Sequence, residues 1–153
     1  MDDAPILICY DDSIGARHAI DVAAVLFADR RAVVLDVAPP LTVAESYAAL
    51  GAVTPDFERM NSEDALSCAH IGAELARRAG LTAEARADIA APTWDGVVEV
   101  ANEISASAIV IGSRGLTGAR ELLNGSLSHQ VAEHAGRPVL IVPPRRSGAK
   151  HRP

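Results

Sequence analysis

The chain has 153 residues, of which 49% are hydrophobic and 3% aromatic, and its formal net charge is −6 at pH 7. This length suits one domain with a sizeable core. The acidic charge argues against nonspecific binding to nucleic acid, and no apolar run approaches the roughly 18 residues that would cross a membrane, so we expect neither a nucleic-acid nor a membrane partner.

The first half of the chain alternates short apolar runs with helical patterns. Residues 6–9 form an apolar run too short for a helix, which indicates a buried strand. The turn Asp11-Asp12-Ser13 follows, and apolar residues at helical spacing predict a helix over 16–27. A second strand is predicted over 32–37, then a loop to about residue 56, then a long amphipathic helix over 60–79 with Gly80 as its C-cap.

The second half continues the same alternation. Residues 81–89 alternate apolar and polar side chains, which is typical of a half-exposed strand at a sheet edge. Thr93 or Asp95 is expected to cap a helix that runs to about residue 104. A fourth apolar strand is predicted over 108–111, a helix over 127–135, and a fifth strand over Val139–Val142.

Strands that alternate with helices predict an α/β fold, here a doubly wound open parallel five-stranded sheet of order 3-2-1-4-5 with helices on both faces. Ligands of such folds bind beyond the carboxyl ends of the strands, where the strand order reverses. In this order the reversal lies between the first and fourth strands, where Asp11 and Gly112 emerge.

A spaced set of small residues follows the fourth strand: Gly112 and Gly115, then nine residues, then Gly125 and Ser126. Glycines let backbone N–H groups converge on an anion, and a helix start adds free N–H groups. The alternative is a purely structural loop, since both standard nucleotide-binding fingerprints are absent. Asp11 is expected in the same crevice, which favours phosphate binding.

Residues 112–131 and 135–142 resemble the C-terminal signature of the universal stress protein family, and residues 6–13 resemble its opening. The resemblance covers residues 5–143, and the spacing G-x-x-G-x9-G-[S/T] is that of the family's ATP-binding branch. It implies a nucleotide-binding domain over 1–143. The basic residues 144–153 are expected to form a disordered tail.

The resemblance also implies roles for single residues. Asp11 is expected to meet the adenosine end of ATP, and Val37 to offer backbone groups to adenine. Arg114 could pair with a phosphate, and Ser128 is a weaker candidate. The phosphates, with Mg²⁺ or Mn²⁺, are assigned to Gly112, Gly115, Gly125 and Ser126. Asp12, where the family often has Gly, adds a carboxylate that weakens binding or recruits the cation.

Three function classes remain open: an ATP-binding stress-response sensor, a binder of AMP or a cyclic adenine nucleotide, and a nucleotide-free dimeric scaffold. No catalytic set stands out, although His129 beside Ser126 is a conceivable general base, so we expect at most slow hydrolysis of ATP. His and Cys residues do not fall at metal-binding spacing, so no protein metal site is indicated.

Three further expectations concern the chain as a whole. The N-terminus lacks the features of a signal peptide, and Cys9 and Cys68 are expected as packed free thiols, so we expect a cytoplasmic location. A homodimer is expected through the apolar edge strand Val139–Val142. The alternative is that the basic tail folds back over that edge.

Overall fold

The computed structural model describes residues 3–41, 55–113 and 127–145. Its elements in chain order are β1 (Ile6–Cys9), α1 (Ile14–Leu26), β2 (Arg31–Ala38), α3 (Pro55–Arg78), β3 (Thr82–Ile89), α4 (Thr93–Glu103), β4 (Ala108–Gly112), α5 (Leu127–His134) and β5 (Val139–Val142). None of the helices in these ranges is long and apolar enough to span a bilayer.

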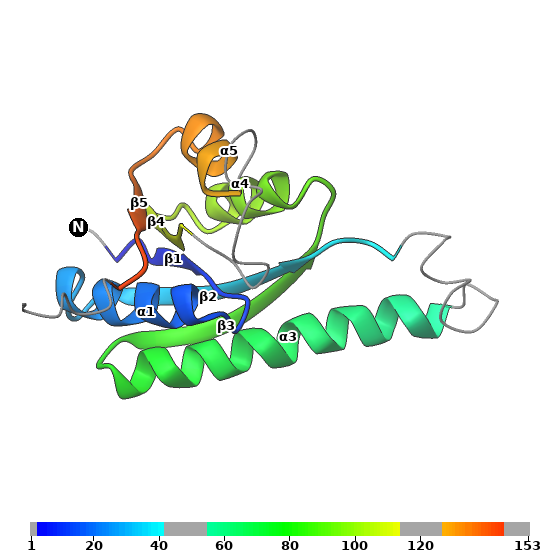
Figure 1. Cartoon of the computed structure of the whole chain (residues 1–153), viewed down its shortest axis with the longest axis horizontal. Coiled ribbons are helices and arrows are strands. Elements are labelled where there is room, and N and C mark those ends of the chain that lie inside the picture. The colour runs from blue at the N-terminus through cyan, green and yellow to red at the C-terminus, as the bar shows by residue number, and fades with distance from the viewer. Residues whose placement is uncertain (1–2, 42–54, 114–126, 146–153) are drawn as a thin grey trace, which may run out of the picture.

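The five strands form one parallel sheet in the order β3-β2-β1-β4-β5, which confirms the predicted topology. At its centre, Ile8 of β1 pairs with Val34 of β2 and Val110 of β4. Figure 1 shows the two layers of helices, with α1 and α3 on one side of the sheet and α4 and α5 on the other. The switch between strand orders therefore lies between β1 and β4.

Both faces of the central strands are buried, which explains why their sequences are continuously apolar. Alternate residues of β1 contribute to two separate cores: Ile6 and Ile8 pack in the core under α1 and α3, and Leu7 and Cys9 in the core under α4 and α5. Cys68 packs against the α1–α3 core. The two cysteines thus lie against opposite faces, and both are free thiols as predicted.

Local signals set the start of α1 and the end of α3. Ser13 is the N-cap of α1, and its Oγ accepts a hydrogen bond from the backbone N–H of Ala16 at 3.1 Å. After α3, Gly80 has φ +105°, its N–H donates to the carbonyl of Arg77, and the N–H of Leu81 donates to the carbonyl of Ala76. This pair of bonds is a Schellman motif, which requires the left-handed conformation that glycine adopts freely.

Two local predictions were wrong. The N-cap of α4 is Pro92, with no side-chain capping bond, and Thr93 and Asp95 lie inside the first turn. Proline suits a helix start because the first N–H groups of a helix need no partner within it. The apolar pattern that predicts a helix over 16–27 includes Leu26, but this side chain is 59% exposed; the helix ends there, and Phe27 packs against the α1–α3 core instead.

Candidate functional site

The β1–β4 switch point is built closely around the start of α1. The backbone N–H of Tyr10 still donates to the carbonyl of Leu35 at 2.8 Å, so Asp11 comes where the chain leaves the sheet. Gly112 is the last residue of β4, and a Cβ added to it would lie 3.0 Å from the backbone carbonyl atoms of Gly15. A glycine is therefore needed here for β4 to end against the first turn of α1.

Of the predicted site residues, Asp11 follows β1, Val37 lies near the carboxyl end of β2, and Ser128 lies in the first turn of α5. The Oδ1 of Asp11 accepts a hydrogen bond from the backbone N–H of Ser13 at 3.0 Å, which closes a tight turn. Val37 packs against the α4–α5 core, where a Cβ added to Gly96 would lie 3.0 Å from its Cγ1. Ser128 is buried in the first turn of α5, on the helix face that also carries Val131.

The remaining predicted phosphate-binding residues lie outside the described ranges: Arg114, Gly115, Gly125 and Ser126. Their roles stay predictions from the sequence. His129, the conceivable general base, is exposed and lies 3.9 Å from the carboxylate of Glu133. His129 therefore lies on the solvent-exposed surface of α5, whereas Ser128 is buried.

Asp12 has a role that the sequence reasoning missed. Its backbone is left-handed, with φ +63°. Its Oδ1 accepts hydrogen bonds from the hydroxyl of Tyr10 at 2.8 Å and from Nη2 of Arg17 at 2.5 Å. These two bonds hold the pKa of the Asp12 carboxyl below its usual value. Burial, and then the bond to Asp12, raise the pKa of Tyr10.

The Tyr10 hydroxyl is fixed in place because its ring is part of the core. Tyr10 is only 2% exposed, and its ring lies against α3 at Gly72, where a Cβ would come within 2.7 Å of ring atoms. No short-range sequence pattern joins these residues, because Tyr10 directly follows β1 and Arg17 lies beyond the helix cap. The signals that could have indicated the contact are a lone tyrosine ending an aliphatic strand and a glycine inside a helix.

Asp36 and Cys68 form a second polar contact near the ends of β1 and β2. Burial raises the pKa of Asp36, while a hydrogen bond from the Cys68 thiol partly opposes that rise. Burial, together with the Asp36 carboxylate, raises the pKa of the Cys68 thiol to about 12. Asp36, which the sequence allows either to reach the ribose or to be a solvated charge at a strand end, thus faces α3 and is partly buried. Within the described residues, no group of three or more His, Cys, Asp or Glu side chains could hold a metal ion.

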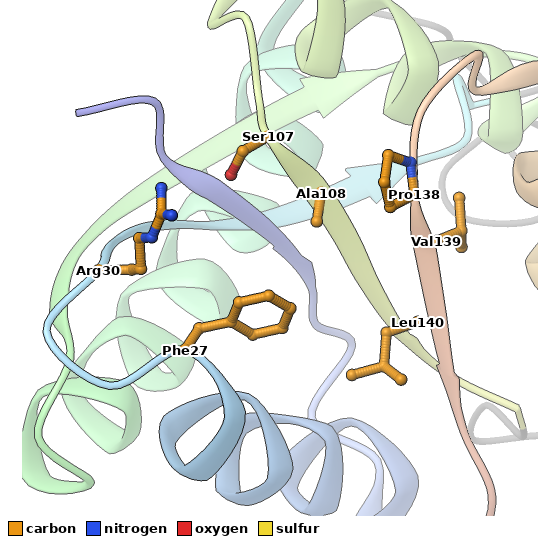
Figure 2. Close-up of a pocket in the computed structure, with 7 residues that line it drawn as sticks. All are labelled: Phe27, Arg30, Ser107, Ala108, Pro138, Val139 and Leu140. Atoms are coloured by element: carbon orange, nitrogen blue, oxygen red, sulfur yellow. The ribbon is translucent and has the colours of Figure 1, made fainter. Parts of the chain in front are cut away.

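A cavity of about 420 Å³ lies at the other end of the sheet, among the amino ends of β4 and β5 and the carboxyl end of α1. Figure 2 shows Leu140 of β5 pointing toward Phe27 across this cavity, with Ser107 and Arg30 at its polar side. Its lining is otherwise apolar, and it has no part in the switch-point crevice. It adjoins the exposed edge strand instead.

Comparisons with known proteins bear on the family and the fold. The model of the Universal stress protein family matches residues 4–143. The universal stress protein YxiE of Bacillus subtilis (strain 168) is 46% identical over 46 residues, which are 30% of this chain and 31% of that protein. The match therefore spans less than a third of that relative's length.

Solved structures share the fold over nearly the whole chain. The universal stress protein from Archaeoglobus fulgidus in complex with dAMP has a TM-score of 0.62 and 23% identity, and covers 90% of this chain and 96% of its own. A universal stress protein in complex with cAMP has a TM-score of 0.66 and 22% identity, and covers 92% and 97%. At these identities the likeness shows the fold.

Proposed function

The chain belongs to the universal stress protein family, and on that premise we propose that it binds ATP, together with Mg²⁺ or Mn²⁺, beyond the carboxyl ends of β1 and β4. Binding would make it a nucleotide-dependent sensor in the stress response. The observation that carries the proposal is that Asp11 and Gly112 end neighbouring strands at the point where the strand order reverses.

The chemistry of the proposed contacts suits an adenine nucleotide. An ionised carboxylate has two acceptor oxygens, so Asp11 can keep the bond from Ser13 and still accept from a ribose hydroxyl. Backbone groups of Val37 would meet the adenine. The phosphates would lie over Gly112, Gly115, Gly125 and Ser126 near the start of α5, with Arg114 and Ser128 as further contacts.

The metal in this proposal would be held chiefly by the nucleotide. The described residues do not offer a cluster of metal ligands, and Mg²⁺ commonly binds substrate phosphates while keeping several waters. The cation would supply charge neutralisation for the phosphates. We propose at most slow hydrolysis, because fast phosphoryl transfer needs an Asp that holds Mg²⁺, whereas Oδ1 of Asp12 already accepts hydrogen bonds from Arg17 and Tyr10 and the described residues offer no cluster of metal ligands.

A second candidate ligand is AMP or a cyclic adenine nucleotide. The observation that favours it is that two structures of the same fold hold dAMP and cAMP. A nucleotide-free dimeric scaffold is the third reading. The three readings differ in the number of phosphates that the crevice must hold. Titration with nucleotides that carry different numbers of phosphates measures this directly.

Isothermal calorimetry with ATP, AMP and cAMP, each with and without Mg²⁺, tests the proposal. We expect ATP to bind most tightly, and we expect Mg²⁺ to strengthen the binding of ATP more than the binding of cAMP. Bound ATP should also raise the melting temperature, since a ligand at a hundredfold excess over Kd stabilises the folded state by about 2.7 kcal/mol. Absence of heat and of any thermal shift with all three nucleotides at millimolar concentration would refute nucleotide binding. Tighter binding of AMP or cAMP would favour the second candidate.

We further propose a homodimer through β5 and a cytoplasmic location. β5 is an edge strand, its Ile141 is 40% exposed, and the apolar cavity beside Leu140 adjoins it. An edge strand offers unpaired backbone groups to a second chain.

The free thiols Cys9 and Cys68 support a reducing compartment. Of the basic tail, the structure describes Arg145, which pairs with Asp21 of α1 at 2.7 Å; residues 146–153 lie outside the described ranges.

A further inference from the structure

The turn between β1 and α1 contains a residue in an unfavourable backbone conformation. Asp12 has φ +63°, in the left-handed region that costs an ordinary L-residue about 1–2 kcal/mol. Aspartate tolerates this region better than most residues, but glycine adopts it freely. Asp12 lies between Asp11, the proposed ribose ligand, and Ser13, the cap of α1. Its conformation therefore sets the direction in which the Asp11 carboxylate leaves the sheet.

Two donors on different elements meet one oxygen of Asp12. The Tyr10 hydroxyl comes from the end of β1, and the Arg17 guanidinium from the first turns of α1. The Tyr10 side is rigid, because its buried ring lies against the backbone of α3 at Gly72, beside Val34. The Arg17 side is exposed by comparison, since 53% of its side-chain surface is accessible, and an exposed ion pair by itself contributes little.

We propose that Tyr10 is a positioning residue for the nucleotide site: with Arg17 it holds Asp12 in the left-handed turn that directs Asp11 into the crevice. This inference rests on the proposed nucleotide binding. In this arrangement Oδ1 of Asp12 accepts from two protein donors. To bind a cation with the oxygen that now accepts both bonds, Asp12 would have to give up a buried hydroxyl and a guanidinium.

The first test compares two substitutions that both delete the Asp12 carboxylate. Asp12→Gly keeps the left-handed turn at no steric cost, so we expect its Kd for Mg-ATP to stay within about twofold of the wild type. Asp12→Ala also lacks the carboxylate, but alanine disfavours the left-handed conformation. We expect its Kd to rise about tenfold, because part of the binding free energy must then restore the turn. If both variants lose affinity equally, or both lose the Mg²⁺ dependence, the carboxylate is a ligand and the proposal is overturned.

The second test uses Tyr10→Phe, which deletes the hydroxyl and leaves the packed ring. In the wild-type background we expect Kd to rise about fivefold, on the scale of one lost hydrogen bond. In the Asp12→Gly background the same change should have less than a twofold effect, because glycine needs no donor to keep the turn. Equal losses in both backgrounds would show that Tyr10 acts through packing alone, and would overturn the proposal.

Arg17→Gln should follow the same pattern with a smaller effect. Its matched control is Arg31→Gln, which breaks the ion pair with Asp3 at the amino end of the sheet and should leave Kd unchanged. A loss of affinity in Arg31→Gln as large as in Arg17→Gln would show a general charge effect and would count against the proposal.

A readout without nucleotide separates this inference from the proposed function. The amide of Ser13, which donates to Asp11, reports the turn in a ¹⁵N–¹H correlation spectrum. We expect Tyr10→Phe to shift this resonance in the wild-type background and to leave it nearly unchanged in the Asp12→Gly background. If the wild type binds no adenine nucleotide but this pattern appears, the proposed function fails while Tyr10 still sets the turn. An unmoved Ser13 resonance in both backgrounds would overturn the positioning role.

Discussion

The ring of Tyr10 lies directly against the backbone of α3 at Gly72, so closely that a Cβ at Gly72 would come within 2.7 Å of ring atoms Cγ and Cδ1. A third neighbour, Cγ1 of Val34, would be 2.8 Å away. Because Tyr10 and Val34 are both buried, neither can move aside at low cost. The glycine of α3 therefore leaves room for the tyrosine ring, and this lets the tyrosine hydroxyl reach Asp12.

Gly72→Ala should accordingly destabilise the protein although alanine favours helix formation. Overpacking a core costs about 1–3 kcal/mol, which exceeds the roughly 1 kcal/mol that alanine gains over glycine in a helix. We expect a lower urea midpoint with an unchanged slope. Ile71→Ala, at a 50% exposed position next in the same helix, is the control and should change the free energy of unfolding by less than about 0.5 kcal/mol. A Gly72→Ala protein as stable as the control would contradict the packing argument.

Asp11 should be the described residue that matters most for nucleotide affinity. Asp11→Ala is expected to weaken ATP binding by about 1–3 kcal/mol, the scale of a charge-assisted hydrogen bond. Asp11→Asn keeps an oxygen that can accept from the Ser13 N–H, so it isolates the charge from the turn. We expect Asn to bind ATP between Ala and the wild type by calorimetry. A loss below about 0.5 kcal/mol in Asp11→Ala would remove this residue from the site.

The glycines outside the described ranges are testable through the same titration. Gly125→Val, or Gly115→Val, should abolish ATP binding, because a β-branched side chain blocks close approach of the backbone to a phosphate or demands an unfavourable φ. The circular dichroism spectrum should stay that of the wild type, which serves as the control for folding. Unchanged affinity with a normal spectrum would mean that these glycines are structural only.

Burial of Asp36 predicts a pH-dependent stability. Its folded pKa is raised above 3.8 by burial, so the folded state holds the proton more tightly than the unfolded chain. The free energy of unfolding therefore loses a contribution as pH rises from about 4 through the raised pKa. Asp36→Asn removes the ionisable group, keeps an acceptor for the Cys68 thiol, and should be more stable than the wild type at pH 7. The gain should vanish below pH 4.

Denaturation at pH 3.5, 5 and 7 measures this difference. Asp64→Asn, an exposed aspartate on the same helix as Cys68, is the matched control and should show little change at any of the three pH values. A difference between Asp36→Asn and the wild type that stays constant with pH would show that burial of the carboxylate is not its cause.

The limits of prediction from this sequence are visible in particular residues. The strands and their order followed from short apolar runs, and the end of α3 from Gly80, because these signals act within a few residues. The cap of α4 was missed because Pro92 begins the helix without a side-chain bond. The contact of Tyr10 with Gly72 was missed because it joins two distant segments through packing, which has no sequence period. The hydrogen bond from Tyr10 to Asp12 was missed because it depends on where the core holds the tyrosine ring.

The dimer proposal can be tested at Ile141, the exposed apolar side chain of the edge strand. Ile141 is 40% exposed on β5, and a second copy paired along this strand would cover it. Ile141→Lys would bury a charge in that contact without disturbing the described core, so the mass by light scattering at tens of micromolar should fall from twice the chain mass to 16.0 kDa. Met60→Lys, at a 53% exposed position on α3, is the control and should stay dimeric. A wild-type monomer that becomes dimeric only when residues 144–153 are deleted would instead show that the tail covers β5.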